Sequence, residues 1–95
     1  MRSMALEFAK TRLTVNAVCP GYVETPMTHE TIARLVAKTG RSEEQALAEF
    51  TKANPQGRLI RPEEVANTVL WLASSDAGSI NGQAIAISGG EVMAG

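Results

Sequence analysis

Residues 20–27, Pro-Gly-Tyr-Val-Glu-Thr-Pro-Met, carry the side chains best placed to bind a ligand in this sequence. The uncharged stretch Leu13–Cys19 precedes them and predicts a β-strand that ends at Pro20-Gly21. In open α/β sheets, ligands bind just beyond the carboxyl ends of the strands. The hydroxyl of Thr25 follows that end and precedes a predicted helix, so it either contacts a ligand or caps the helix. The sequence therefore predicts a ligand loop at residues 20–27.

The other reactive side chains near this loop lack the partners that catalysis needs. A tyrosine acts as an acid or base beside a cation that favours its ionised form, and no such pairing can be recognised around Tyr22. Cys19 has no recognisable base or cation, so we expect a small core residue. His29 is the only histidine, and a lone histidine makes no metal site. We therefore predict neither a catalytic residue nor a metal site in this chain.

Glycine spacing argues against a phosphate-binding turn. The glycines stand at positions 21, 40, 57, 78, 82, 89, 90 and 95 and match neither Gly-x-x-x-Gly-x-Gly nor Gly-x-Gly-x-x-Gly. Such turns bring a dinucleotide's phosphates to the N-terminus of a helix. The sequence thus contains no phosphate cradle.

Length and composition limit the class of protein. The 95 residues suit one small domain, and a hydrophobic fraction of 44% is ordinary for a globular chain. Nine basic residues face ten acidic ones, which leaves no electrostatic footprint for nucleic acid or an anionic membrane. No apolar run approaches the roughly 20 residues that span a bilayer, and no signal-peptide core opens the chain. We expect a soluble cytoplasmic protein that binds neither nucleic acid nor membrane.

Several further elements must position the ligand loop. Apolar periodicity and capping signals predict helices over residues 2–11, about 28–38, from 43 to about 50, and from 62 to about 73, with a second strand at Gln83–Ser88. Two uncharged strands separated by helices suit a parallel pair. Two strands do not make an independent sheet, so the chain is predicted to contain one edge of a larger one.

Three side-chain patterns make specific structural predictions. Ser42 and Gln45 match a capping box. The helix that begins at Pro62 has a wide apolar stripe and should be well buried, with Trp71 as a core or interface anchor. Asn16 lies inside an apolar strand, where its amide must find partners, so we expect it to tie the strand to a neighbouring loop.

Four ordered segments resemble the short-chain dehydrogenase/reductase family. The spacing Asn16-x-x-x-Pro20-Gly21-x-x-x-Thr25 resembles that family's late strand and cofactor loop. Three more segments resemble the helix before the last strand, the end of that helix, and the last strand with its exit: Gly57-Arg58-x-x-x-Pro62-Glu63-Glu64-Val65-Ala66, Trp71-Leu72-Ala73-Ser74, and Asn81-Gly82-Gln83 with Ser88-Gly89-Gly90. The resemblance covers nearly the whole chain.

This resemblance implies an α/β fold class, the C-terminal part of a Rossmann-type doubly wound parallel sheet with two strands and about four helices. It implies that residues 1–95 form a single partial domain of an NAD(P)-binding Rossmann domain and that residues 28–53 are substrate-lid-like helices. The family's catalytic Ser, Tyr and Lys would precede Met1, so the chain alone is expected to be inactive. The parent enzyme would interconvert a ketone and a secondary alcohol with NAD or NADP, similar to 3-oxoacyl-thioester or polyketide ketoreductases.

The resemblance also assigns roles within the ligand loop. Tyr22 would line the substrate pocket, and the cofactor-binding residues would be Pro20, Gly21, Val23, Thr25 and Met27. Structural explanations stay open beside these roles: strand termination for the Pro-Gly pair, helix capping for the threonine, and packing for the others. The partners implied are a small carbonyl or alcohol substrate and further copies of the chain, in a dimer or tetramer.

A different class of function is also open. An unpaired strand edge and exposed helix faces seek a partner, so the chain could be a non-catalytic, truncated fragment that acts only as a self-associating or partner-binding module. Titration with a dinucleotide separates the two hypotheses, because only the oxidoreductase segment has a reason to bind one.

Overall fold

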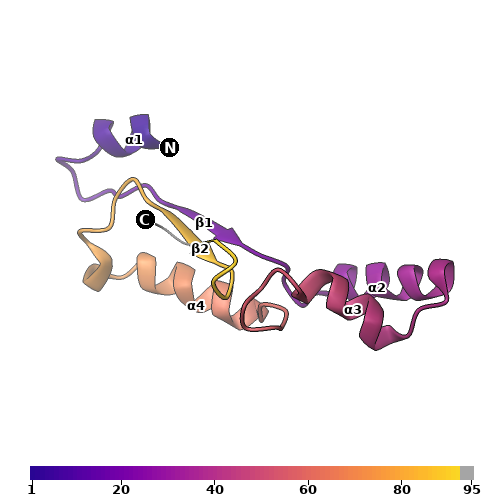
Figure 1. Ribbon diagram of the computed structural model, residues 1–95. Coiled ribbons are helices and arrows are strands. Elements are labelled where there is room, and N and C mark those ends of the chain that lie inside the picture. Colours follow the sequence, from indigo (N-terminus) through magenta and orange to yellow (C-terminus); the bar gives the residue numbers. More distant parts are fainter. Residues whose placement is uncertain (93–95) are drawn as a thin grey trace.

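The chain folds into four α-helices and two short strands, and the structure, a computed structural model, describes residues 1–92 (Figure 1). In chain order the elements are α1 (Arg2–Glu7), β1 (Ala17–Pro20), α2 (Pro26–Thr39), α3 (Glu43–Thr51), α4 (Pro62–Leu72), the 3-10 turn η1 (Ser75–Ala77) and β2 (Ala84–Ile87).

The two strands form a parallel pair. Ala17 pairs with Ala84 at one end of the ladder and Pro20 with Ile87 at the other. Helices α2, α3 and α4 lie in the connection between the strands, and α4 packs against β1. The predicted α/β class, with a parallel pair joined by a helical crossover, is therefore confirmed.

The described chain is elongated. Its extents are 56 × 27 × 22 Å and its radius of gyration is 17.1 Å, against about 12 Å for a compact chain of this length. Figure 1 shows the reason: the sheet, α1 and α4 form one end, and α2 with α3 projects from the other. The exposed surface of 7023 Å² exceeds the roughly 5,300 Å² of a compact protein of this mass. Residues 1–92 therefore do not close a core around the sheet.

The first strand is shorter than its apolar composition predicts. A strand from Leu13 is expected, but β1 begins at Ala17. Residues 13–16 face a turn instead of a strand: Gly82 has a φ of 72° and donates its N–H to the carbonyl of Val15 at 2.8 Å. The side chain of Asn16 pairs with this turn instead: its Nδ2 donates to the carbonyl of Ile80 at 2.9 Å, and its Oδ1 accepts the Gln83 N–H at 3.0 Å. The predicted tie between Asn16 and a neighbouring loop is confirmed.

Within residues 1–92 the two-stranded sheet is covered on one face only, whereas the uncharged sequences of its strands predict burial on both faces. Side chains alternate across it: Val18, Ile85 and Ile87 are half-buried on one face, whereas Cys19, Ala84 and Ala86 are exposed on the other. The prediction that Cys19 is a core residue is wrong for residues 1–92: its side chain is exposed, because α4 packs on the other face of β1.

Helix α4 also differs from its prediction. Its apolar stripe predicts burial, but none of its residues is buried. Val69, Leu70 and Trp71 are 48, 69 and 50% exposed. The stripe is wider than the narrow contact that one two-stranded sheet provides, so part of it faces outward.

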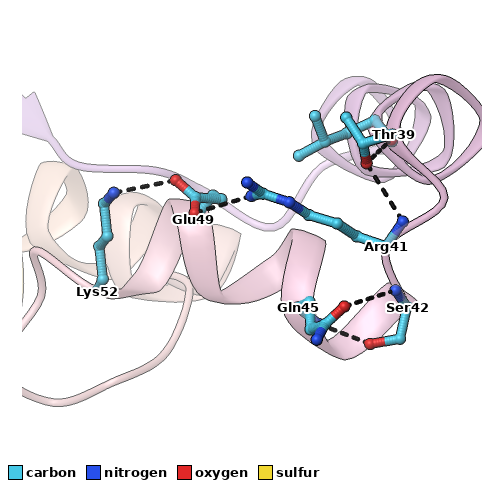
Figure 2. A network of polar contacts seen from close by, with 7 residues as sticks. Thr39, Arg41, Ser42, Gln45, Glu49 and Lys52 are labelled. Atoms are coloured by element: carbon cyan, nitrogen blue, oxygen red, sulfur yellow. Dashed lines mark hydrogen bonds and ion pairs between the residues drawn. The ribbon is translucent and has the colours of Figure 1, made fainter.

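Local capping signals predict the helix ends well. Ser42 and Gln45 form both bonds of the capping box at the start of α3, as Figure 2 shows. Gly40, with φ at 69°, ends α2 in the left-handed conformation. Helix α1 is the exception: it ends at Glu7, not near residue 11, because the Thr11 hydroxyl bonds the Phe8 carbonyl at 2.6 Å and competes with the helix.

No helix within residues 1–92 combines the length and apolar character that crossing a bilayer requires.

Candidate functional site

Strand β1 runs directly into the predicted ligand loop. The N–H of Gly21 donates to the carbonyl of Ile87 at 2.9 Å, which extends the parallel ladder one residue beyond Pro20. An added Cβ at Gly21 would contact the Ser88 backbone at 3.6 Å, so the two strand exits lie close together. The loop therefore starts from a fixed position at the carboxyl end of the sheet.

A second backbone pairing holds the middle of the loop. Val23 and Ile60 form a parallel bridge, in which Ile60 N–H donates to Tyr22 O and Glu24 N–H donates to Ile60 O, both at 2.8 Å. Ile60 is only 2% exposed, the most deeply buried large side chain described. In such a bridge the middle residue directs its own N–H and C=O to the opposite side of the strand. The amide and carbonyl of Val23 therefore face away from Ile60.

The segment that carries Ile60 is itself anchored to α4. The Glu64 carboxylate forms two ion pairs. Its Oε1 lies 2.9 Å from Arg58 Nη2 and 3.0 Å from Arg61 Nη2. The hydrogen bond from Arg58 lowers the pKa of Glu64 below its ordinary value, and the bond from Arg61 adds to this effect. These charges, all near the surface, orient the loop before α4 and with it the bridge to Val23.

Thr28 completes the polar arrangement around Val23. The Thr28 hydroxyl donates to Val23 O at 2.6 Å and lies 3.1 Å from the hydroxyl of Thr25. The Thr28 N–H donates to Thr25 Oγ1 at 3.2 Å, so Thr25 is the N-cap of α2 and the capping prediction is confirmed. Within residues 1–92, the N–H of Val23 has no acceptor. Sequence reasoning missed Thr28, although its place three residues after a capping threonine was the available signal.

These groups match the hydrogen-bonding pattern of a primary carboxamide. A carboxamide offers one acceptor oxygen and two donor hydrogens. The free Val23 N–H can donate to the oxygen, and Val23 O and Thr25 Oγ1 each retain acceptor capacity for the –NH₂ group. The loop therefore offers the groups that a primary carboxamide can hydrogen-bond, while a glycine-rich turn for dinucleotide phosphates is absent from the sequence.

The other predicted site residues have structural contacts or none. Tyr22 packs edge-on against Phe50 of α3, with ring centroids 5.1 Å apart and an interplanar angle of 86°. This contact joins the loop to α3, and Tyr22 keeps 54% of its surface exposed. Pro20 is the exposed last residue of β1, and Met27, in the first turn of α2, is 73% exposed. These roles toward a cofactor or substrate stay predictions.

A hollow beside α3 is lined by one residue of the loop, Glu24, but by none of the predicted ligand contacts. It encloses about 330 Å³ and is lined by Glu24, His29, Leu47, Thr51, Gly57, Arg58, Leu59 and Arg61. None of the six predicted site residues lines this hollow or four other hollows among residues 1–92.

His29 lies in the first turns of α2. Its Nε2 is 3.4 Å from Glu24 Oε1, and both side chains are more than half exposed. Within the described residues, no group of three His, Cys, Asp or Glu side chains could hold a metal ion. This pair therefore joins the loop to α2 at the surface.

Comparison with known proteins gives a consistent result. A family model described as enoyl-(acyl carrier protein) reductase matches residues 1–91. A putative ketoacyl reductase of the monensin polyketide synthase from Streptomyces virginiae is 45% identical over 89 residues, which cover 94% of this chain and 34% of that protein. The chain therefore spans about a third of the length of the curated relatives it matches.

Solved structures share the same fold. The actinorhodin polyketide ketoreductase with NADPH, a variant form, has a TM-score of 0.79 and 39% identity over 95% of this chain and 34% of its own. L-sorbose reductase from Gluconobacter frateurii, complexed with NADPH and L-sorbose, has a TM-score of 0.86 and 29% identity over 98% of this chain and 36% of its own. The elongated shape of residues 1–92 fits a chain that matches only about a third of each of these proteins.

Proposed function

Because this chain belongs to the short-chain dehydrogenase/reductase family, we propose that it is the C-terminal, nicotinamide-side segment of an NAD(P)-dependent oxidoreductase. The observation that carries the proposal is the donor and acceptor pair of Val23, which faces away from Ile60 beside the hydroxyls of Thr25 and Thr28. Two structural relatives, the actinorhodin polyketide ketoreductase and L-sorbose reductase, were solved with NADPH, which supports the choice of cofactor.

When bound, the nicotinamide cofactor supplies or accepts a hydride. This chain's own contribution is to position the ring. Val23 and Thr25 would hold the carboxamide, Pro20 and Gly21 would let the backbone approach the ring, and Met27 would flank it. Positioning of this kind contributes a large part of the rate acceleration in enzymes, because it removes rotational freedom before the reaction.

The proposed substrate is a small ketone or secondary alcohol, of the 3-oxoacyl or polyketide type. Relatives described as ketoacyl reductases support this class. Residues 28–53, which contain most of α2 and all of α3, would form the substrate lid, and Tyr22 would join it to the loop through Phe50. The sequence has no Tyr-x-x-x-Lys pair, so we propose that the 95-residue chain alone has no dehydrogenase activity.

A partner-binding module without catalysis is the second candidate. The surplus of exposed surface and the exposed apolar residues of α4 favour it. The same residues, Val69, Leu70 and Trp71, support a homo-oligomer, a dimer or tetramer, under either hypothesis. Sedimentation equilibrium of the chain measures this association. A cytoplasmic location stays a prediction from the composition.

Titration of the isotopically labelled chain with NADH and NADPH tests the proposed function. We expect saturable chemical-shift changes centred on the Val23 and Thr25 amides, with no turnover of ketone substrates. Absence of saturable binding up to about 10 mM dinucleotide would favour the partner-binding module. Even a dissociation constant of this size corresponds to a binding free energy of a few kcal/mol, so a specific site would be detected. Turnover above background by the pure chain would contradict the predicted inactivity.

A further inference from the structure

We propose that Thr28 is a positioning residue that makes the loop select a carboxamide over a carboxylate. This inference rests on the proposed function, because it concerns the group that would contact Val23 and Thr25. The inference adds one role for Thr28: its hydroxyl determines the direction in which the Thr25 hydroxyl hydrogen points. Helix capping by Thr25 does not require this role.

The contacts of Thr28 determine where each hydroxyl hydrogen lies. A threonine hydroxyl has one hydrogen to donate. The carbonyl of Val23 can only accept, so the 2.6 Å contact uses the hydrogen of Thr28. The 3.1 Å contact between the two hydroxyls must then be a donation from Thr25 to Thr28 Oγ1. Thr25 Oγ1 also accepts the Thr28 N–H at 3.2 Å.

The loop consequently offers a ligand acceptors rather than hydroxyl donors. Thr25 has committed its hydrogen to Thr28 and has acceptor capacity left, as does Val23 O. An –NH₂ group can donate to these oxygens. A carboxylate has no hydrogen to donate and would place a negative charge against these two oxygens, which costs free energy at both contacts. The Val23 N–H accommodates the oxygen of either ligand, so the selectivity comes from the acceptors.

Removing the Thr28 hydroxyl should change this selectivity in a specific way. In Thr28→Val the hydroxyl hydrogen of Thr25 loses its acceptor and becomes free to turn toward the ligand. Thr25 could then donate to a carboxylate as readily as it accepts from an amide. A residue that only stabilised the start of α2 would weaken both ligands by the same factor.

The experiment compares nicotinamide mononucleotide with nicotinic acid mononucleotide, which differ only in this group and need no phosphate cradle for the adenylate half. Binding to the full 95-residue chain is followed through the Val23 amide signal in NMR titrations. We expect the unmodified chain to prefer the amide by about tenfold or more, and Thr28→Val to reduce the preference to about threefold or less. Thr28→Ser retains the hydroxyl and should restore the preference.

Thr31→Val is the matched control. Thr31 lies on the same helix, and its hydroxyl donates to Met27 O at 2.9 Å, away from Val23 and Thr25. It should leave the preference unchanged, while the Ser42 and Gln45 amide signals report that α3 remains folded. The role of Thr28 would be overturned if Thr28→Val weakened the binding of both mononucleotides by the same factor. It would also be overturned if Thr31→Val lost the preference to the same extent as Thr28→Val. Either result would leave the proposed function standing. Failure of the unmodified chain to bind either mononucleotide would overturn both.

Discussion

Gly89→Ala is the substitution that should damage this fold most clearly. Gly89 follows β2 and has a φ of 65°, a conformation that costs a residue with a Cβ roughly 1–2 kcal/mol. An added Cβ would also overlap the side-chain amide of Asn54. That amide is buried, donates to Arg58 O at 2.8 Å and accepts the Gln56 N–H at 2.7 Å. Displacing it would break two hydrogen bonds worth about 1 kcal/mol each. The total is about 3–4 kcal/mol of unfolding free energy.

Gly40→Ala isolates the backbone-conformation part of this effect. Gly40 has nearly the same φ, 69°, yet nothing lies within 4 Å of an added Cβ. It should therefore lose only the conformational part, roughly 1–2 kcal/mol. In the double variant Asn54→Ala with Gly89→Ala the overlap disappears, so its loss should be smaller than the sum of the two single losses.

Urea unfolding followed by the fluorescence of Trp71, the only tryptophan, measures each variant. The expected order of stability is unmodified chain, Gly40→Ala, then Gly89→Ala. If Gly89→Ala cost no more than Gly40→Ala, the close contact between Asn54 and the exit of β2 would be wrong. Additive losses in the double variant would also contradict that contact.

The remaining predictions concern the ties that hold the site in place. Asn16→Ala removes two hydrogen bonds to the turn before β2 and should cost about 1–2 kcal/mol; urea unfolding checks it, and an unchanged midpoint would show that the tie contributes nothing. Glu64 has a folded-state pKa below its unfolded value because Arg58 donates to it. Its stabilisation is therefore present above the ordinary glutamate pKa of about 4.3 and lost as the pH falls through the folded-state value. Glu64→Gln should flatten the fall of the unfolding midpoint in acid, and an equally steep fall in this variant would contradict the assignment.

Features set by residues a few positions apart could be predicted from the sequence. The capping box of Ser42 and Gln45, the left-handed stop at Gly40 and the N-cap of Thr25 are all local. Their partners lie within four residues along the chain, so residue type and spacing suffice to identify them. The position of the ligand loop followed in the same way, because a Pro-Gly pair after an apolar run ends a strand.

Features that depend on distant segments could not be predicted. The start of β1 at Ala17 is decided by the turn at Gly82, and the exposure of Cys19 by the lack of a helix over that face within residues 1–92. Apolar composition shows that a residue can be buried, but not whether another segment covers it.

The donor and acceptor pattern of the site depends partly on neighbouring residues and partly on contacts between distant segments. The sequence by itself determined that Thr25 caps a helix just beyond a strand, since that bond joins neighbouring turns of the chain. Only the tertiary structure decided that Val23 turns its amide and carbonyl away from Ile60, where the carbonyl accepts a hydrogen bond from the Thr28 hydroxyl. The reason is physical: backbone hydrogen bonds between segments far apart in sequence choose which side of a strand stays free, and residue types alone do not specify that choice.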